Sequence, residues 1–175
     1  ISLQIEKSPK TAEYWFLLGQ TYSSKGDTDK AEEAFMKCIE LKPLATQGYL
    51  ALSRLYAASG RDEQAMVRAQ DALKVNPEDV PSLMIGALLH ERAGRYEEAR
   101  AWYEKVLKIN PSFAPAANNL AYVLSEHFQD VSNARKYAQN ARGKAEAIQF
   151  ATLDSVVALM LAFFINAAIL IVAAA

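Results

Sequence analysis

The side chains that could do covalent or metal chemistry are few in this chain of 175 residues, which has one cysteine, Cys38, and two histidines, His90 and His127. A thiol or hydroxyl nucleophile needs a base beside it, and the base needs a group that orients it. The spacing of these residues assembles no such set. So few thiols and imidazoles also disfavour a zinc site closed by protein ligands. The sequence therefore predicts a protein that is not an enzyme and that holds no metal or cofactor.

The charge balance argues against one large class of partner. The chain has 19 Lys and Arg residues against 20 Asp and Glu residues, a net charge of -1, and no basic block. Because a nucleic-acid backbone is recognised by clustered positive charge, we expect no nucleic-acid partner. A single cysteine also excludes an internal disulfide framework.

Three residue types recur every 34 residues and define the elements that must position any site. They are Pro9, Pro43, Pro77 and Pro111, then Gly26, Gly60 and Gly94, then Ala31, Ala65 and Ala99. A fixed period of this length indicates a stack of identical supersecondary units. The next proline would fall near position 145, where Ala145 and Glu146 stand instead, and the composition changes there.

Within one period the pattern predicts two helices joined by a turn. Apolar residues from Trp15 to Tyr22 follow the spacing of one helical face. Gly26 interrupts that face, and Asp27 or Thr28 can cap the helix that follows. Pro43 ends this second helix, because the residue before a proline is disfavoured in the α region. Each unit is therefore predicted to be a helix-turn-helix hairpin.

The residues of this pattern resemble the tetratricopeptide repeat family. The first unit carries the family's positions as Trp15, Leu18, Gly19, Tyr22, Ala31, Phe35, Cys38 and Pro43, and the next two units repeat the offsets. The resemblance implies an all-α fold, a right-handed superhelix that is an α-solenoid of helix-turn-helix repeats. Here the solenoid would be followed by a long apolar C-terminal helix.

The register predicts the domain boundaries. We expect a domain of about four repeats at 10–143, with the repeats at 12–45, 46–79, 80–113 and 114–145. Residues 1–9 keep the same register and are expected to end a truncated preceding repeat. One extra residue between Ser125 and Val131 delays the next small residue to Ala134, and we expect it to lengthen a turn. Residues 146–175 form a separate hydrophobic segment.

Packing explains why the repeat needs these residue types. Small residues let the two helices of a hairpin touch, and large rings fill the space between hairpins. The expected small pairs are Gly19 with Ala31, Ser53 with Ala65 and Ala87 with Ala99, and the expected rings are Trp15, Tyr22, Phe35, Tyr49, Tyr56 and Tyr103. In this register Cys38 is a core residue, His90 lies in the core or at the edge of the groove, and His127 is solvated.

The concave face, lined by the first helix of each unit, is the predicted binding surface. Its inward positions are Glu13, Phe16, Gln20, Gln47, Leu50, Arg54, Met84, Leu88, Asn118 and Tyr122. Apolar side chains with amides and one arginine suit an extended or helical peptide. The alternative is that these residues merely cover the solenoid. Family members that clamp a chaperone's C-terminal carboxylate use Lys and Asn where this chain has Phe16 and Gln20, so that partner class is not expected.

The last 21 residues, 155–175, are apolar except for Ser155 and Asn166. A helix of this length spans about 30 Å, the thickness of a bilayer's hydrocarbon core, so the segment is a candidate transmembrane helix. Basic residues precede it at Arg135, Lys136, Arg142 and Lys144. If the helix spans a membrane, the positive-inside rule puts the repeats on the cytoplasmic side. Otherwise we expect a cytoplasmic protein.

Residues 146–175 also resemble the seventh transmembrane helix of bacterial Nramp-type divalent-metal transporters. The stretch that carries the resemblance includes Asp154, Ser155, Ala158, Leu159, Phe163, Asn166, Ala168, Leu170 and residues 173–175. The family's metal-binding motifs, Asp-Pro-Gly-Asn and Met-Pro-His, have no counterpart here, so transport is not implied. Asn166 is interpreted as an orphaned or helix-pairing amide, with a working role as the alternative. The resemblance suggests that two unrelated coding sequences meet near 142–146, joined naturally or during sequence assembly.

These observations support two functional hypotheses. The first is a non-catalytic protein-protein interaction scaffold that binds a peptide or partner segment in the concave groove, tethered to a membrane if the apolar helix spans one. The alternative is a fragment or chimera that carries one helix of a proton-coupled divalent-metal transporter and has no transport activity of its own.

Overall fold

The structure, a computed structural model, describes residues 4–5 and 8–141. Helices make up the regular secondary structure of this part of the chain. They are α2 (Ala12–Ser24), α3 (Thr28–Leu41), α4 (Thr46–Ala58), α5 (Asp62–Val75), α6 (Val80–Arg92), α7 (Tyr96–Ile109) and α8 (Ala114–Phe128), followed by a helix over 131–141. Two helices therefore lie within each of the ranges 12–45, 46–79 and 80–113.

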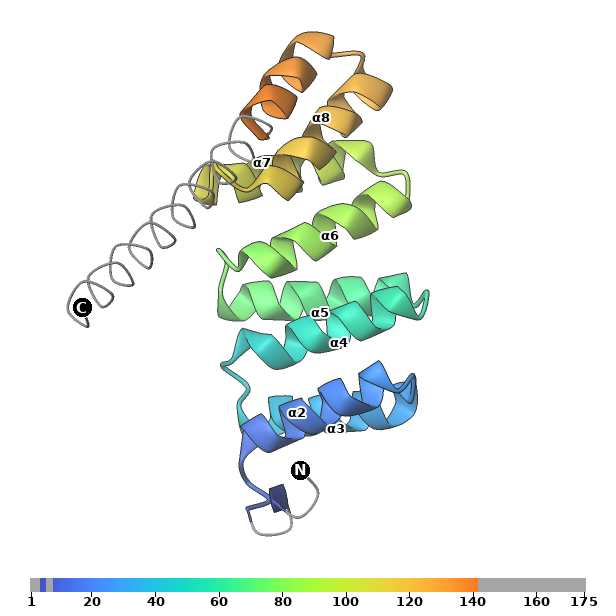
Figure 1. Cartoon of the computed structure of the whole chain (residues 1–175), viewed down its shortest axis with the longest axis vertical. Helices are drawn as coiled ribbons and strands as arrows, with labels where there is room; N and C mark the ends of the chain where they lie inside the picture. Colours follow the sequence, from blue (N-terminus) through green and yellow to red (C-terminus); the bar gives the residue numbers. More distant parts are fainter. Residues whose placement is uncertain (1–3, 6–7, 142–175) are drawn as a thin grey trace, which may run out of the picture.

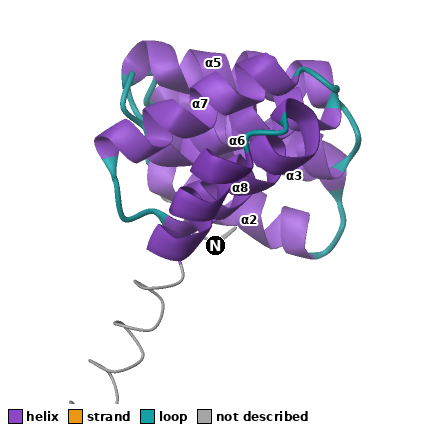
Figure 2. Ribbon diagram, turned by 90° about the horizontal axis from the view of Figure 1, so that it is seen from above, coloured by secondary structure: helices purple, strands orange, loops and turns teal. Residues whose placement is uncertain are grey.

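The helices stack as hairpins in chain order, as Figure 1 shows. Helices α2 and α3, α4 and α5, and α6 and α7 pack within hairpins, and α3 with α4, α5 with α6, and α7 with α8 join one hairpin to the next. Seen along the stack in Figure 2, the helices overlie one another and the loops gather at their ends. This arrangement confirms the predicted all-α solenoid.

The turn inside each of the first three hairpins depends on a glycine. Gly26, Gly60 and Gly94 have φ angles of 78°, 72° and 72°, a left-handed conformation that costs other residues free energy. In the first hairpin the Asp27 carboxylate then accepts a hydrogen bond from the backbone N–H of Lys30, at 3.3 Å. Asp27 is thus the N-cap of α3, which was one of the two predicted caps.

In the fourth repeat the extra residue lengthens a helix, and the prediction that it lengthens a turn is wrong. Helix α8 has 15 residues where α6 has 13. The turn that follows holds two non-helical residues, 129–130, where the third repeat has three, 93–95. Gln129 takes the left-handed conformation, with φ of 54°. The longer helix is favoured because its last residues gain contacts, since His127 stacks on Tyr96 and Phe128 lies under the Arg100 guanidinium.

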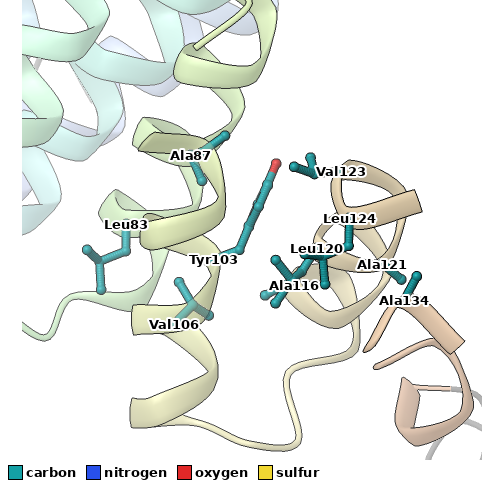
Figure 3. Packing of buried hydrophobic residues seen from close by; sticks show 11 residues of the cluster. Leu83, Ala87, Tyr103, Val106, Ala116, Leu120, Ala121, Val123, Leu124 and Ala134 are labelled. Carbon is teal, nitrogen blue, oxygen red and sulfur yellow. The ribbon is translucent and has the colours of Figure 1, made fainter. Parts of the chain in front are cut away.

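The largest buried side chain in the second half of the stack is Tyr103, which has no exposed surface. Figure 3 shows its ring between α7 and α8, with Val123 near the hydroxyl end. The hydroxyl donates to Glu91 Oε2 at 2.7 Å and accepts from Asn119 Nδ2 at 3.2 Å. Burial is therefore combined with full hydrogen bonding, as a buried phenol requires. Burial, helped by the bond to Glu91, raises the pKa of Tyr103.

The predicted small pair of Ser53 and Ala65 meets across the second hairpin. Ser53 Oγ donates to the Ala65 carbonyl at 2.7 Å, and both residues are buried. A Cβ atom on Gly19 would lie 2.6 Å from the Phe35 ring, so this position needs glycine. Cys38 is buried, which confirms its core role, and burial raises the pKa of its thiol.

The large rings divide into two groups, which the repeat pattern alone does not distinguish. Phe35, Tyr56 and Tyr103 are buried, whereas Trp15, Tyr22 and Tyr49 are half-buried. Trp15 Nε1 donates to the Pro9 carbonyl at 2.8 Å and Tyr49 Oη to the Pro43 carbonyl at 3.2 Å. These two rings therefore hold the segment before their own repeats through a hydrogen bond. That they also fill the space between hairpins stays a prediction.

The prediction of a membrane-spanning helix concerns residues 155–175, which lie outside the described residues. The same holds for the resemblance over 146–175, for Asn166 and for the end of the fourth repeat after 141. Within 4–5 and 8–141, no helix is long and apolar enough to cross a bilayer.

Candidate functional site

The first helices α2 and α4 form the walls of a groove of about 480 Å³, here called the N-terminal groove. It is lined by Phe16, Gln20, Ser23, Ser24, Phe35, Gln47, Leu50, Ala51, Arg54, Leu55 and Ala58. These two helices lie side by side because α3, the second helix of the first hairpin, packs against both. The groove is thus a direct product of repeat stacking.

The N-terminal groove has an apolar floor and a polar margin. Phe35 and Leu55 are buried, and the Phe16 ring lies 5.9 Å from the Phe35 ring, centroid to centroid. Gln20 and Arg54 are exposed. Within the described part of the chain the Arg54 guanidinium has no hydrogen-bond or ion-pair partner. It is also the single charged side chain among the lining residues. The groove therefore offers apolar contact beside one uncompensated positive charge.

A second groove, of about 460 Å³, lies further along the stack and is here called the C-terminal groove. Its lining residues are Leu88, Glu91, Arg92, Tyr96, Tyr122 and His127. The Tyr96 and His127 rings stack with centroids 3.4 Å apart and planes at 10°. Tyr122 meets His127 edge-on at 6.1 Å and 80°. Tyr122 remains 55% exposed and Leu88 44% exposed, so both leave apolar surface open in the groove.

The two charged side chains of the C-terminal groove, Arg92 and Glu91, differ in whether they have an ion-pair partner. Arg92 Nε forms an ion pair with Asp62 Oδ2 at 2.9 Å, and its Nη1 donates to the Ala57 carbonyl at 3.3 Å. The Glu91 carboxylate accepts the hydrogen bond of buried Tyr103, and no cation of the described residues pairs with it. The positive charge in this groove is thus compensated from within the protein, and the negative charge is not.

The ten residues predicted for the concave face divide between these grooves and their surroundings. Phe16, Gln20, Gln47, Leu50 and Arg54 line the N-terminal groove, and Leu88 and Tyr122 line the C-terminal groove. Glu13, Met84 and Asn118 line neither. The Glu13 carboxylate pairs with Lys42, which lowers the Glu13 pKa through that hydrogen bond. Met84 packs against the core cluster that contains Tyr103.

The repeat pattern did not indicate several lining residues. Ser23, Ser24 and Ala58 come from the ends of α2 and α4, beyond the inward positions. Glu91, Tyr96 and His127 come from the turn side of the last two hairpins. His127 is exposed, as predicted, but it is stacked on Tyr96 because α8 is longer than the register implies. The sequence signal for this position is the one-residue insertion, for which a longer turn is predicted and a longer helix is found.

His90, the other histidine of the chain, takes part in packing. His90 is half-buried, with Nδ1 accepting from Arg95 Nε at 3.0 Å and its ring 5.3 Å from the Trp102 ring. Burial, and then the charge of Arg95, lowers the pKa of His90. In the described part of the chain no three metal-ligating side chains lie together.

A solenoid of helical hairpins with a lined groove defines a class of repeat proteins that bind other proteins along an extended face. Models of the tetratricopeptide repeat match residues 12–43 and 50–115. The chain therefore belongs to the tetratricopeptide repeat family, as its residues indicated.

Solved structures show the same fold. A crystal structure of MamA aligns with a TM-score of 0.74 at 23% identity, covering 85% of this chain and 86% of that one. MamA from Desulfovibrio magneticus RS-1 aligns with a TM-score of 0.69 at 13% identity, covering 82% of this chain and 80% of that one. The first tetratricopeptide domain of Spaghetti (RPAP3), solved with the HSP90 peptide SRMEEVD, aligns with a TM-score of 0.62 at 20% identity. This last alignment covers 65% of this chain and 93% of that one.

A short stretch of the chain matches a different kind of protein. Over 41 residues it is 66% identical to the divalent metal cation transporter MntH of Bradyrhizobium diazoefficiens. Over 40 residues it is 60% identical to MntH of Mesorhizobium japonicum. Each match covers 23% of this chain and 9% of the transporter. The predicted resemblance to an Nramp-type transporter is confirmed, and the chain spans less than a tenth of the length of these relatives.

Proposed function

We propose that this protein is a non-catalytic interaction scaffold that binds a peptide segment of a partner protein in its concave grooves. The N-terminal groove is the observation that carries the proposal. Phe16, Leu50 and buried Phe35 provide apolar contact, while exposed amides can pair with a peptide backbone. Arg54, which has no partner among the described residues, favours a ligand with an acidic group at that point.

Two observations weigh in favour of peptide binding over the alternative that these residues only cover the solenoid. The groove holds about 480 Å³, which suits one or two side chains of a ligand. The RPAP3 domain with the same fold is solved with a bound peptide. The SRMEEVD peptide itself is not expected here, because Phe16 and Gln20 stand where such clamps carry Lys and Asn.

Selection of a random dodecamer peptide library on the full chain tests the proposal. The variant Phe16→Ala/Leu50→Ala should lose at least about 10-fold in affinity for the selected peptides, because each anchor contributes roughly 1 kcal/mol or more. The matched control is Met36→Ala/Val67→Ala, two exposed apolar residues that do not line the groove. Equal binding by the wild type and the groove variant would refute the proposal.

We further propose that residues 155–175 anchor the scaffold in a membrane, since the segment is apolar throughout except for Ser155 and Asn166. The full chain should float with phosphatidylcholine vesicles in a density gradient. It should stay with the vesicles after a wash with carbonate at high pH. A chain ending at residue 141 should remain at the bottom of the gradient. Release of the full chain by carbonate would contradict an integral anchor.

The match to MntH favours a second candidate, a fragment or chimera that carries one transporter helix without transport activity. Vesicles that contain the full chain should then take up no more Mn²⁺ than empty vesicles. Uptake above that level would contradict this candidate. Amplification from source DNA across codons 140–150 distinguishes a natural fusion, which yields one continuous product, from an assembly junction, which yields none.

A further inference from the structure

We infer that the C-terminal groove is a subsite for a basic side chain, lysine or arginine, of the bound peptide. The inference rests on the proposed function, because it names the chemistry of one part of the peptide that the scaffold binds. Its basis is the arrangement of the Glu91 carboxylate, the exposed ring of Tyr122 and the exposed aliphatic side chain of Leu88 within a single groove.

The carboxylate of Glu91 is held in place, and no cation of residues 4–5 and 8–141 pairs with it. Tyr103 donates to Oε2 at 2.7 Å, and Tyr103 is itself fully buried and bonded to Asn119. The position of Glu91 is thus set by the core and does not depend on a ligand. The neighbouring cation, Arg92, is paired with Asp62 at 2.9 Å. A ligand that enters the groove therefore meets an uncompensated negative charge that is already oriented, which lowers the entropic cost of binding a cation.

The rings and Leu88 suit the rest of a basic side chain. Tyr122 is 55% exposed and is steadied by the edge contact with His127, which in turn stacks on Tyr96. An exposed tyrosine face attracts a lysine or arginine cation. Leu88, 44% exposed, can cover the aliphatic stem of such a side chain. The groove thus provides a contact for the charged end and another for the stem.

Other ligand groups fit this groove less well. An apolar side chain would shield the Glu91 carboxylate from water without pairing it, and burying an unpaired charge is costly. An acidic side chain would face a like charge. The N-terminal groove has the opposite character, because its single charged side chain is Arg54. The two grooves together predict a peptide with an acidic group toward the first two repeats and a basic group toward the last two.

The test uses dodecamers selected from the random library on the full wild-type chain. Lysine and arginine should be enriched in the selected sequences. Replacing that lysine by norleucine in one selected peptide should weaken binding to the wild type by roughly 10-fold, the effect of losing one charge pair with a ring contact. Glu91→Gln should lower the affinity for the lysine peptide by about threefold, because the ring contact remains, and should not lower the affinity for the norleucine peptide. Gln keeps an oxygen that accepts from Tyr103, so this variant preserves the core.

Two further variants separate the subsite from general effects of charge. Glu97→Gln changes the same charge on α7 outside the groove and should leave both affinities unchanged. Tyr122→Leu should weaken the lysine peptide about threefold, because the ring face is lost. Peptides that need Phe16 and Leu50 but gain nothing from lysine, or that bind Glu91→Gln as tightly as wild type, would overturn the inference and leave the proposed function standing. A library that yields no binder would overturn both.

Discussion

The first and third hairpins fill the same place with side chains of opposite size. In the first hairpin Leu18 on α2 stands in register with Gly86 on α6, and Ala34 on α3 with Trp102 on α7. In the third hairpin a Cβ atom on Gly86 would overlap the Trp102 ring. The large residue has moved from the first helix to the second. One large and one small residue thus occupy this pair of positions in both hairpins, on opposite helices.

A second difference concerns polarity. Phe35 and Tyr103 occupy the same register position, 68 residues apart. Phe35 packs on Phe16 in the floor of the N-terminal groove, so this register position is apolar in the first hairpin. Tyr103 carries a hydroxyl that needs partners, and one of them, Glu91, is a groove residue. The Tyr103 hydroxyl thus connects the buried core to the Glu91 carboxylate of the C-terminal groove.

The largest loss of stability is expected on truncation of Tyr103, the largest fully buried side chain of the described residues. Tyr103→Ala should lower the free energy of unfolding by about 3–5 kcal/mol, because a fully buried ring is removed. Tyr122→Ala is the matched control and should cost less than about 1 kcal/mol, since that ring is 55% exposed. Urea unfolding followed by circular dichroism measures both. Similar losses for the two tyrosines would show that the cluster in Figure 3 does not carry stability.

The pairing of a small residue with a large one across the third hairpin can be tested by substitution at Gly86 and Trp102. Gly86→Ala should destabilise the protein by about 1–3 kcal/mol, because the new methyl group overlaps the Trp102 ring. In a Trp102→Ala background the same substitution should be neutral or stabilising, since alanine is the better helix former. The double variant Gly86→Leu/Trp102→Ala restores the pair found in the first hairpin and should recover most of the loss. Additive effects in a double-mutant cycle would contradict the pairing.

The first two repeats are joined by a polar contact whose strength depends on pH. Arg61 Nη1 pairs with Glu32 Oε2 at 2.7 Å and Tyr56 donates to Glu32 Oε1 at 2.8 Å. The bond from Arg61, then that from Tyr56, lowers the pKa of Glu32 below its ordinary 4.5. A lowered folded-state pKa stabilises the protein above about 4.5, and this contribution is lost as pH falls through the folded value.

Glu32→Gln should therefore cost about 1–2 kcal/mol at neutral pH, because a charged hydrogen-bonding group is removed. The difference from wild type should shrink as the pH falls below about 4.5. Free energies of unfolding measured from pH 7 to pH 3 provide the check, with Glu33→Gln, an exposed residue of the same helix, as the control. A difference that stays constant with pH would rule out the ionised pair as its source.

The smallest effects are expected at two buried serines, one in each half. Ser53→Ala removes the bond to the Ala65 carbonyl and should destabilise by about 1 kcal/mol. Ser82 is equally buried, but its Oγ has no hydrogen-bond partner among the described residues. Ser82→Ala should therefore stabilise the protein by about 1 kcal/mol. Thermal unfolding of the two variants should show shifts of opposite sign, and shifts of the same sign would refute the assignment.

Much of the fold was predictable from the register of Pro43, Gly26 and Ala31 and their repeats. Each of these residues acts locally, by ending a helix, by turning the chain or by allowing close approach, so its effect does not depend on distant residues. Five of the ten predicted groove residues line one groove for the same reason, since inward positions on α2 and α4 follow from helical spacing. Whether that groove binds a peptide stays a prediction.

Other features depended on contacts that no local pattern contains. The extra residue near Ser125 was visible in the sequence, but its addition to α8 was decided by the stacking of His127 on Tyr96 across the hairpins. The orientation of the Glu91 carboxylate depends on Tyr103, twelve positions later in the chain. The buried hydroxyl of Tyr103 needs a hydrogen-bond acceptor, and Glu91 provides it. The sequence by itself determined the 34-residue unit, because helix ends and turns are local. The tertiary structure alone decided which charges remain uncompensated, because pairing depends on what the stacked repeats bring together.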